Sequence, residues 1–210
     1  MSNDVIYETI VTTVSAAGAP HIAPMGVRYA GGDIVLMPFR PSATYDNIVG
    51  TGTAVVNLTT DVRVFAGCVT GRRQWPTVPA QRIHGVRLAG ALSHVELRLA
   101  QQSGDPARPS LRMARVIEAS HGDFPGFNRA QAAVIEGAVL VSRLHLLPAD
   151  KIAREMAYLQ IAIDKTAGAA EREAWQWLQQ RVAAWHAGDT GPAHGARHGA
   201  NPEPTLEKTR

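Results

Sequence analysis

The sequence has little that would tie it to a membrane or to an oxidising compartment. Cys68 is its only cysteine, so no disulfide can form within the chain. No run of apolar residues approaches the roughly 20 needed to cross a bilayer. The first residues, MSNDVIYE, lack the basic segment and apolar stretch of a secretory signal. We therefore expect a cytoplasmic protein with no membrane partner.

Several motifs that carry well-known chemistry are also missing. The sequence contains no Gly-x-Ser-x-Gly, Walker or Rossmann fingerprint, which argues against most acyl transfer and nucleoside-triphosphate chemistry. Of the eight histidines, His194 and His198 are four residues apart, but they lie in a Gly- and Pro-rich segment unsuited to a helix. We therefore expect no metal site. Cys68 has no base next to it in the sequence, and we expect a buried, inert thiol.

The charge distribution argues against nucleic acid as a partner. Lys and Arg total 21 against 18 Asp and Glu. The basic residues are spread along the chain and are neither clustered nor interleaved with aromatic residues, as a nucleic-acid binder would usually have them. The mild basic excess would suit a ligand that carries phosphate as readily as a polyanion.

The composition is typical of a soluble globular protein, and the first half of the sequence is rich in predicted strands. Hydrophobic residues make up 45% of the 210 residues and charged residues 19%, enough for one domain with an appendage. A run rich in β-branched residues over 5–14, and further apolar or extended runs separated by turn signals, predict strands. These runs cover residues 5–14, 20–30, 34–39, 53–58, 86–99 and 111–119. Such strands joined by short turns favour a small antiparallel barrel or sandwich.

The hydrophobic period changes to helical spacing near Asn128. A first helix is predicted over 128–144, although its end, AVLVSRL, also fits a strand. A second helix, capped by Asp150, carries an apolar stripe from Ile152 to Ile163, and a third carries Trp175 to Trp185. We therefore expect an α+β, mainly β fold: a barrel over 1–122, a helical section over 123–186 and a disordered tail over 187–210.

The segment from Phe39 to Asn47, FRPSATYDN, contains a cluster of groups suited to binding phosphate. It follows a predicted strand and opens a helical turn, whose first N–H groups and dipole favour an anion. Arg40 adds a guanidinium group, Ser42 and Thr44 add hydroxyls, and Asn47 adds an amide. The alternative is a loop whose hydroxyls only cap the helix.

The second strand, PHIAPMGVRYA, holds two prolines and a glycine. Because proline lacks the N–H needed inside a sheet, this strand must be an edge, be bulged or face something other than a strand. A planar ligand against the bared backbone would explain the composition, with Gly26 allowing close approach and Met25 offering a polarisable contact. The alternative is an ordinary barrel bulge.

A third segment, GFNRA, places Asn128 as a helix N-cap and Arg129 in the first helical turn. A cation there opposes the positive end of the helix dipole unless an anion is bound nearby. The segment is therefore a weak indication of a site. The alternative is an ordinary surface arginine.

Taken together in this order, GAPHIAPMGV, MPFRPSATYDNI, VVNLTTDV and FNRAQAAVIEGAVLVSRL resemble the domain-of-unknown-function family 447. That family belongs to the FMN-binding split-barrel group, with flavin reductases and pyridoxamine-phosphate oxidases. The resemblance implies a split β-barrel that holds FMN near the interface of a homodimer. Members look like they occur where methanopterin-type one-carbon carriers are used, which implies a link to that metabolism.

The resemblance also implies residue roles. The segment with Phe39 and Arg40 would meet the FMN phosphate through Ser42, Thr44 and Asn47. The backbone of Ala23, Pro24, Met25, Gly26 and Val27 would flank the isoalloxazine ring, and Asn128 and Arg129 would approach the same ligand. No catalytic residue is implied.

These observations leave three candidate functions. The first is a flavin-dependent oxidoreductase in which FMN carries hydride or electrons. The second is a non-catalytic flavin-binding or assembly protein whose helical section docks a partner. The third is a barrel that holds haem or a deazaflavin, for which His84, His94 and His121 are the loose axial-ligand candidates.

Overall fold

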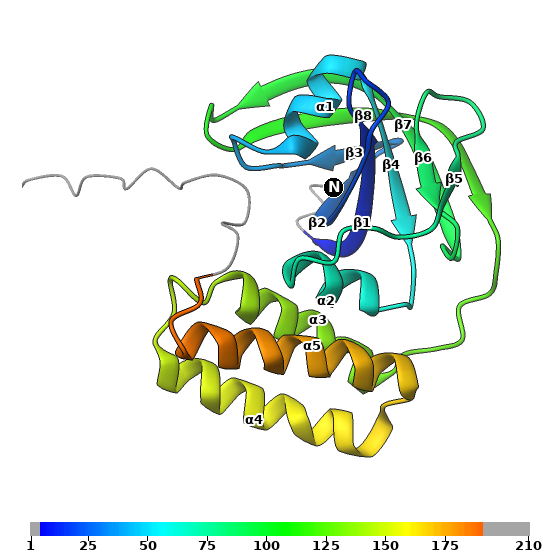
Figure 1. Ribbon diagram of the computed structural model, residues 1–210. Helices are drawn as coiled ribbons and strands as arrows, with labels where there is room; N and C mark the ends of the chain where they lie inside the picture. The colour runs from blue at the N-terminus through cyan, green and yellow to red at the C-terminus, as the bar shows by residue number, and fades with distance from the viewer. Residues whose placement is uncertain (1–4, 191–210) are drawn as a thin grey trace, which may run out of the picture.

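The computed structural model describes residues 5–190, and it folds as a β-barrel above a layer of helices (Figure 1). Six strands close the barrel in the order β1-β2-β3-β8-β7-β4, and each neighbouring pair is antiparallel. The strands are β1 (Tyr7–Val14), β2 (Pro20–Ala30), β3 (Asp33–Leu36), β4 (Thr53–Leu58), β7 (Ser93–Gly104) and β8 (Pro109–Ser120).

The barrel interior is filled by the alternate residues that a strand turns to one face. They include Val11 of β1, Val27 of β2 and Val95 of β7, each at most 1% exposed. The opposite face of β1 turns Ile10 toward the helices. The alternation therefore gives the barrel strands two apolar faces, one for the interior and one for the helical layer.

Two helices and a hairpin fill the connections between strands. Helix α1 (Ala43–Thr51) links β3 to β4, and α2 (Arg63–Val69) follows β4. Strands β5 (Thr77–Pro79) and β6 (Val86–Leu88) pair with each other outside the barrel. The fully buried Asn57 of β4 accepts the Leu88 N–H through Oδ1 at 2.8 Å and donates from Nδ2 to the Ile10 carbonyl at 3.0 Å. One amide thereby fixes the hairpin against both β4 and β1.

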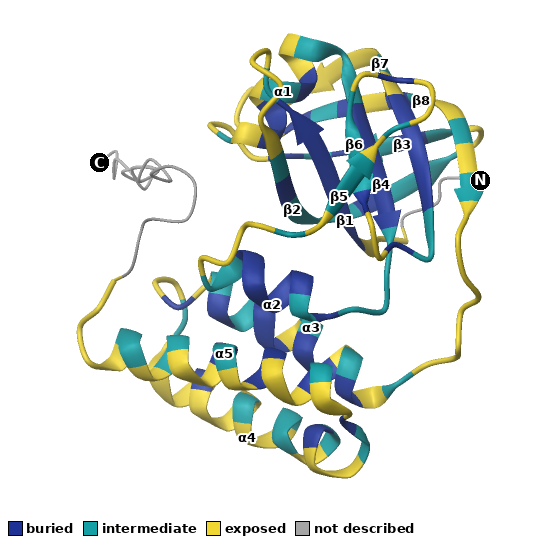
Figure 2. Cartoon of the chain, turned by 45° about the vertical axis from the view of Figure 1, so that its right-hand side comes forward, coloured by how far each residue is buried: buried dark blue, intermediate teal, exposed yellow. Residues whose placement is uncertain are grey.

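The helical layer consists of α3 (Arg129–Ser142), α4 (Ala149–Thr166) and α5 (Ala169–His186). Its buried residues form a second core with α2 and the outer face of the barrel, separate from the barrel interior (Figure 2). Helices α3 and α5 approach closely at Gly137, where a Cβ would lie 2.8 Å from the Trp175 ring and 3.0 Å from Leu178.

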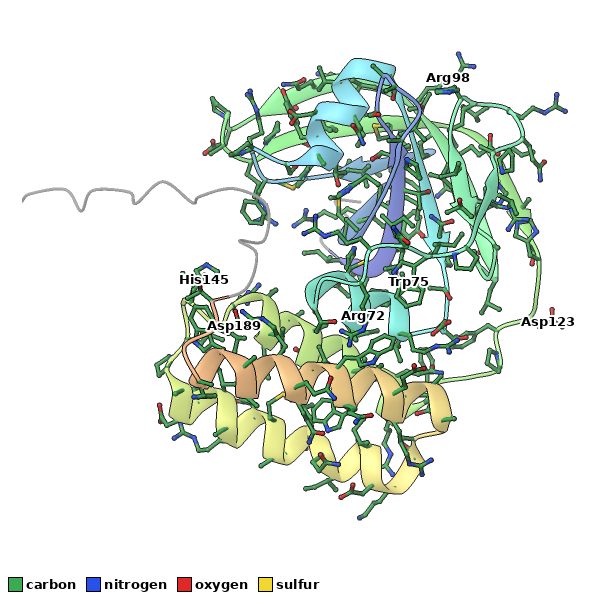
Figure 3. The ribbon with its side chains drawn as sticks, in the orientation of Figure 1. Arg72, Trp75, Arg98, Asp123, His145 and Asp189 are labelled. Carbon is green, nitrogen blue, oxygen red and sulfur yellow. The ribbon has the colours of Figure 1, made fainter. Side chains whose placement is uncertain are left out.

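The loop after α2 joins the two layers. Arg72 places its guanidinium 4.4 Å above the ring of Trp177 in α5, and Trp75 donates from its ring nitrogen to the Arg72 carbonyl at 3.0 Å. Figure 3 shows both residues at the junction of α2 with α5. None of the helices in residues 5–190 is both long and apolar enough to cross a membrane.

The predicted strands at 5–14, 20–30, 53–58 and 111–119 are confirmed, with bounds within a few residues. The single strand expected over 86–99 is wrong, because the chain turns between Leu88 and Ser93 and forms β6 and β7 instead. Helix α2 and strand β5 were not expected. Helix content, about 35%, slightly exceeds strand content, about 32%.

The three C-terminal helices are confirmed, and the segment 138–144 is helical up to Ser142. The cap expected from Asp150 is wrong: Pro148 is the N-cap of α4, and Asp150 lies in the first turn, where it pairs with Arg154 at 2.6 Å. A carboxylate in the first turn still stabilises the helix through its dipole. The tail expected to be disordered from 187 onward lies, from residue 191, outside the described residues.

Candidate functional site

The turn between β3 and α1 presents unpaired backbone donors. Ser42 is the N-cap: its hydroxyl accepts the Tyr45 N–H at 3.3 Å and its carbonyl accepts the Asp46 N–H at 3.0 Å. Within the described chain, this leaves the N–H groups of Ala43 and Thr44 without an acceptor. Two such groups at the positive end of a nine-residue helix form a place where an anion is stabilised.

Two guanidinium groups flank this turn. Arg40 lies 4.5 Å above the ring of Tyr45, in the first turn of α1, and its backbone N–H donates to the Ala107 carbonyl at 2.9 Å. Arg108 lies 4.8 Å above the ring of Phe39. Arg40 and Phe39 are exposed. The turn therefore combines free amides with two positive charges that solvent or a ligand can reach.

Thr44 and Asn47 face the barrel as well as the turn. Thr44 is 3% exposed. Asn47 donates from Nδ2 to the Thr13 hydroxyl of β1 at 2.9 Å, which fixes α1 on the barrel. A ligand phosphate at this turn would meet the Ala43 and Thr44 amides and Arg40 more readily than the buried Thr44 side chain.

Strand β2 has an open edge, as its prolines predicted. Strand β3 pairs only with Val27–Ala30, so residues 20–26 pair with β1 alone. The register with β1 runs without a break from Val14↔Pro20 to Tyr7↔Val27, so the strand is an edge rather than a bulge. Ala23, Pro24 and Met25 are half-buried along this edge.

Two residues of the predicted ring-flanking segment have further neighbours. Val27 is buried in the barrel interior, so only its backbone faces outward. At Gly26, a Cβ would lie 2.5 Å from Cγ2 of Ile6. The close approach expected at Gly26 is therefore made here by the chain itself, through Ile6.

Asn128 and Arg129 lie apart from the other predicted residues. Asn128 is the N-cap of α3, as expected: its Oδ1 accepts the Ala130 N–H at 2.8 Å, and its Nδ2 donates to the Thr166 carbonyl at 3.1 Å. Arg129 is exposed. Within one chain, α3 belongs to the helical layer and α1 lies at the far end of the barrel (Figure 1), so this pair does not join the α1 turn.

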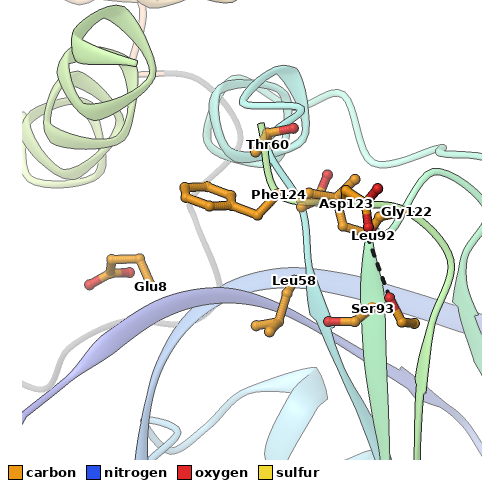
Figure 4. Close-up of a pocket in the computed structure, with 10 residues that line it drawn as sticks. Glu8, Leu58, Thr60, Leu92, Ser93, Gly122, Asp123 and Phe124 are labelled. Carbon is orange, nitrogen blue, oxygen red and sulfur yellow. Dashed lines mark hydrogen bonds between the residues drawn. The ribbon is translucent and has the colours of Figure 1, made fainter. Parts of the chain in front are cut away.

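A pocket of about 490 Å³ opens where the ends of β4, β7 and β8 meet the segment that leads to α3. Its lining includes Leu58, Thr60, Ser93, Asp123 and Phe124, with Glu8 at one end (Figure 4). Glu8 pairs with Gly26 across the β1–β2 ladder, so this end of the pocket reaches the part of β2 that has no second strand beside it. Burial raises the pKa of the Glu8 carboxyl, and Glu136 adds to this effect while Arg143 opposes it.

A buried polar cluster on the outer face of β7 escaped the sequence reasoning. Glu96 is fully buried, and its carboxylate accepts backbone N–H groups from Gln81, Arg82 and Ile83. Its other partner is Nε2 of His94 at 3.2 Å. Alternation along the strand could have shown that residues 94 and 96 share a face, but nothing in the sequence shows that the loop 13 to 15 residues before Glu96 folds back onto that face.

The three candidate histidines give no support to the hypothesis that the barrel holds haem. Both ring nitrogens of the fully buried His94 are engaged, with Glu96 and, at 2.8 Å, with Nε2 of His121. His84 is exposed on the loop before β6. Residues 5–190 contain no group of three His, Cys, Asp or Glu side chains that could hold a metal ion. Burial raises the pKa of the Cys68 thiol to about 11, which suits the inert thiol expected.

A closed antiparallel barrel with one open strand edge, followed by a helical section, defines an α+β protein of the split-barrel class. The chain belongs to the DUF447 family of proteins of unknown function. The N-terminal domain of that family matches residues 7–122, and its C-terminal domain matches residues 128–180.

Solved structures share this fold. The chain is similar to the crystal structure of an FMN-bound DUF447 protein from Methanosarcina mazei, with 19% identity, a TM-score of 0.72 and coverage of 84% of this chain and 94% of that one. Lower scores are found for a 2-nitrobenzoate 2-nitroreductase from Pseudomonas fluorescens (18% identity, TM-score 0.48, covering 54% and 64%). A flavoredoxin from Desulfovibrio vulgaris is similar at 13% identity and a TM-score of 0.47, covering 58% and 73%.

Proposed function

We propose that this protein binds FMN and acts as a flavin-dependent oxidoreductase on a small molecule. The observation that carries the proposal is the fold shared, over most of both chains, with an FMN-bound member of the same family. The phosphate would lie at the α1 turn, and the ring would lie along the open edge of β2. When bound, FMN would supply the hydride or electron chemistry, and the protein would supply binding and orientation.

The residues present fit such a ligand. An FMN phosphate needs several donors that converge from different directions, and the Ala43 and Thr44 amides and the Arg40 guanidinium meet that need. The isoalloxazine ring is planar and has hydrogen-bonding groups along its edge. The backbone of β2 from Ala23 to Gly26 has no second strand beside it, so it leaves groups for such a ring to pair with, whereas the Ile22 carbonyl already accepts the Cys68 thiol at 3.5 Å.

The test is FMN uptake by the purified protein, followed by the visible spectrum and compared with riboflavin, which lacks the phosphate. Arg40→Gln removes one charged hydrogen bond and should weaken FMN by about 10- to 100-fold while changing riboflavin little. Arg154→Gln on α4 removes the same charge far from the turn and serves as the control. Absence of FMN binding, or equal affinity for FMN and riboflavin, would refute the proposal.

A second candidate function is a non-catalytic flavoprotein whose helical section docks a partner. It is favoured by Tyr158 and Ile161, apolar side chains that stand exposed nearly one turn apart on α4. Anaerobic mixing of the FMN-loaded protein with NADH and with NADPH separates the two. Bleaching of the flavin absorbance at a useful rate supports the oxidoreductase, and bound flavin that neither nicotinamide reduces supports the docking protein.

We infer that the protein works as a homodimer. Val5, Ile6 and Tyr7 are consecutive exposed apolar residues at the N-terminal end of β1, and Ile6 lies against Gly26 of β2. A second copy would cover them. Analytical ultracentrifugation should give twice the chain mass, and Ile6→Lys should shift the protein toward monomer, whereas Ile161→Lys on α4 should not. A wild-type monomer would refute the inference.

A further inference from the structure

The pocket at the end of the barrel has the form of a slot with one aromatic wall. Figure 4 shows the Phe124 ring on one side, Leu58 and Ser93 across from it, and the Glu8 carboxylate at one end. Leu92 adds a second apolar side chain to the lining. At about 490 Å³ the pocket is large enough for a small aromatic molecule. An aromatic ring placed against Phe124 would gain both area burial and ring–ring contact.

The polar lining of the pocket is rich in acceptors and negative in charge. Its charged groups are the carboxylates of Glu8 and Asp123, and its lining residues include no Lys, Arg or His. Within the described chain, the hydroxyls of Thr60 and Ser93 make no recorded hydrogen bond and can serve a ligand. Ligands with a carboxylate or phosphate would be repelled here, whereas a cation or a hydrogen-bond donor would be attracted.

The charges that face Glu8 from the helical layer do not reverse this character. Helix α3 brings Glu136 and Arg143 close enough to act on Glu8, one of each sign. Glu136 raises the pKa of the Glu8 carboxyl and Arg143 lowers it, so their effects oppose each other. The carboxylates of Glu8 and Asp123 therefore set the sign of the pocket.

The pocket also borders the place proposed for the flavin. Glu8 is the cross-strand partner of Gly26, and a Cβ on Gly26 would lie 3.6 Å from Oε1 of Glu8. A molecule held in the pocket would thus end over Gly26, in the part of β2 along whose open edge the ring is placed. This step rests on the proposed function.

We propose that this pocket binds the substrate of the proposed oxidoreductase, and that the substrate is a planar aromatic molecule with a cationic or hydrogen-bond-donating group. Its ring lies against Phe124 and its donor group faces the Glu8 carboxylate. Anionic aromatic acids are excluded as substrates of this site.

The test uses two probes of the same shape and opposite charge, benzamidine and benzoate. Binding is measured by titration calorimetry on the full chain, both without FMN and loaded with it. We expect benzamidine to bind at least about tenfold more tightly than benzoate, because a charged hydrogen bond is made in one case and repulsion in the other. Adding benzamidine should also shift the visible spectrum of bound FMN.

Variants assign the binding to the pocket. Glu8→Gln should weaken benzamidine by about tenfold, and Phe124→Ala by about threefold or more. Asp150→Asn removes an exposed carboxylate on α4, and Tyr158→Ala removes an exposed aromatic ring there. Both controls should bind benzamidine like the wild type. Circular dichroism of each variant checks that it is folded.

The outcomes separate this inference from the proposed function. FMN binding without a preference for benzamidine, or benzamidine binding unchanged by both pocket variants, overturns the pocket proposal and leaves the FMN proposal standing. Benzamidine binding that depends on Glu8 and Phe124 in a protein that takes up no FMN refutes the proposed function, and with it the assignment of the pocket to an oxidoreductase substrate.

Discussion

Replacing Glu96 by Gln should cost more stability than a change of one atom suggests. Oε1 of Glu96 takes the Gln81 N–H and His94 Nε2, and Oε2 takes the N–H groups of Arg82 and Ile83. Glutamine keeps one acceptor oxygen and puts an NH₂ group where the other was. Whichever way the amide turns, at least one backbone N–H, that of Gln81 or those of Arg82 and Ile83, then faces a donor.

The size of the loss follows from that unmet donor. A buried donor left without an acceptor costs about 1 to 3 kcal/mol, so Glu96→Gln should lower the free energy of unfolding by roughly 1 to 3 kcal/mol. Glu96 and Ile83 are buried, whereas Gln81 and Arg82 are exposed residues. Loop 80–85, which the carboxylate holds against β7, should loosen first.

Urea unfolding followed by tryptophan fluorescence measures the loss, and limited proteolysis detects opening of the loop. Glu118→Gln on β8 is the matched control, because its carboxylate is more than half exposed and pairs with Arg115 at the surface. That pair is worth about 0 to 1 kcal/mol. A loss below about 1 kcal/mol for Glu96→Gln would show that the carboxylate does not hold the loop, since one unmet donor alone exceeds that.

The same carboxylate gives stability a pH dependence of known sign. Burial opposes the charge, but hydrogen bonds from the Gln81 and Arg82 amides and from His94 outweigh it and hold the pKa of Glu96 below its usual value. Its contribution is therefore fully present above the unfolded-state pKa, about 4.3, and is lost as pH falls through the folded-state pKa. The Glu96→Gln variant should therefore lose less stability than the wild type as the pH falls. If the free energy of unfolding falls in parallel with pH in both proteins, Glu96 is not the source of this pH dependence.

Three further substitutions test the packing of α3 against α5 and the α1 turn. Gly137→Ala should lower the free energy of unfolding by about 1 to 3 kcal/mol, since its Cβ would press on the buried Trp175 ring. Gly50→Ala in α1 is the control, because a Cβ there meets open space; it should raise the free energy of unfolding by up to about 1 kcal/mol. Equal effects in urea unfolding would refute the close approach of α3 and α5. Thr44→Val should change FMN affinity by less than about threefold if the phosphate meets backbone amides, and a larger loss in an FMN titration would show that the hydroxyl binds it.

Local signals predicted most of the barrel. Strands β1 and β4 are rich in β-branched residues, and β2 begins and ends next to turn residues; these properties are visible in the sequence. Helix α2 was missed because its seven residues follow Val62, an N-cap with no side-chain hydrogen bond, and are mostly apolar without helical spacing. Strands β6 and β7 were merged because apolar residues continue across the turn at Gly90.

The candidate site also has parts that the sequence predicted and parts that it did not. The open edge of β2 was predictable because Pro20 and Pro24 exclude a strand on both sides. The pocket was not predictable, because Glu8 and Phe124 come from segments more than 100 residues apart and neither carries a motif. The hydrogen bonds from Glu96 to the loop were hidden although the loop is only 13 to 15 residues away, because no motif shows that the loop folds back onto β7. Contacts between distant segments depend on the closed barrel, which sequence spacing does not reveal.

The prolines of β2 also bear on how this protein stays out of aggregates. A strand edge with no neighbour is a template onto which another chain can add a strand. Pro20 and Pro24 each remove a backbone donor from that edge, so an incoming strand would find an incomplete ladder. The edge can therefore stay uncovered for a small ligand, and replacing both prolines by β-branched residues would turn it into a point of fibril-like growth.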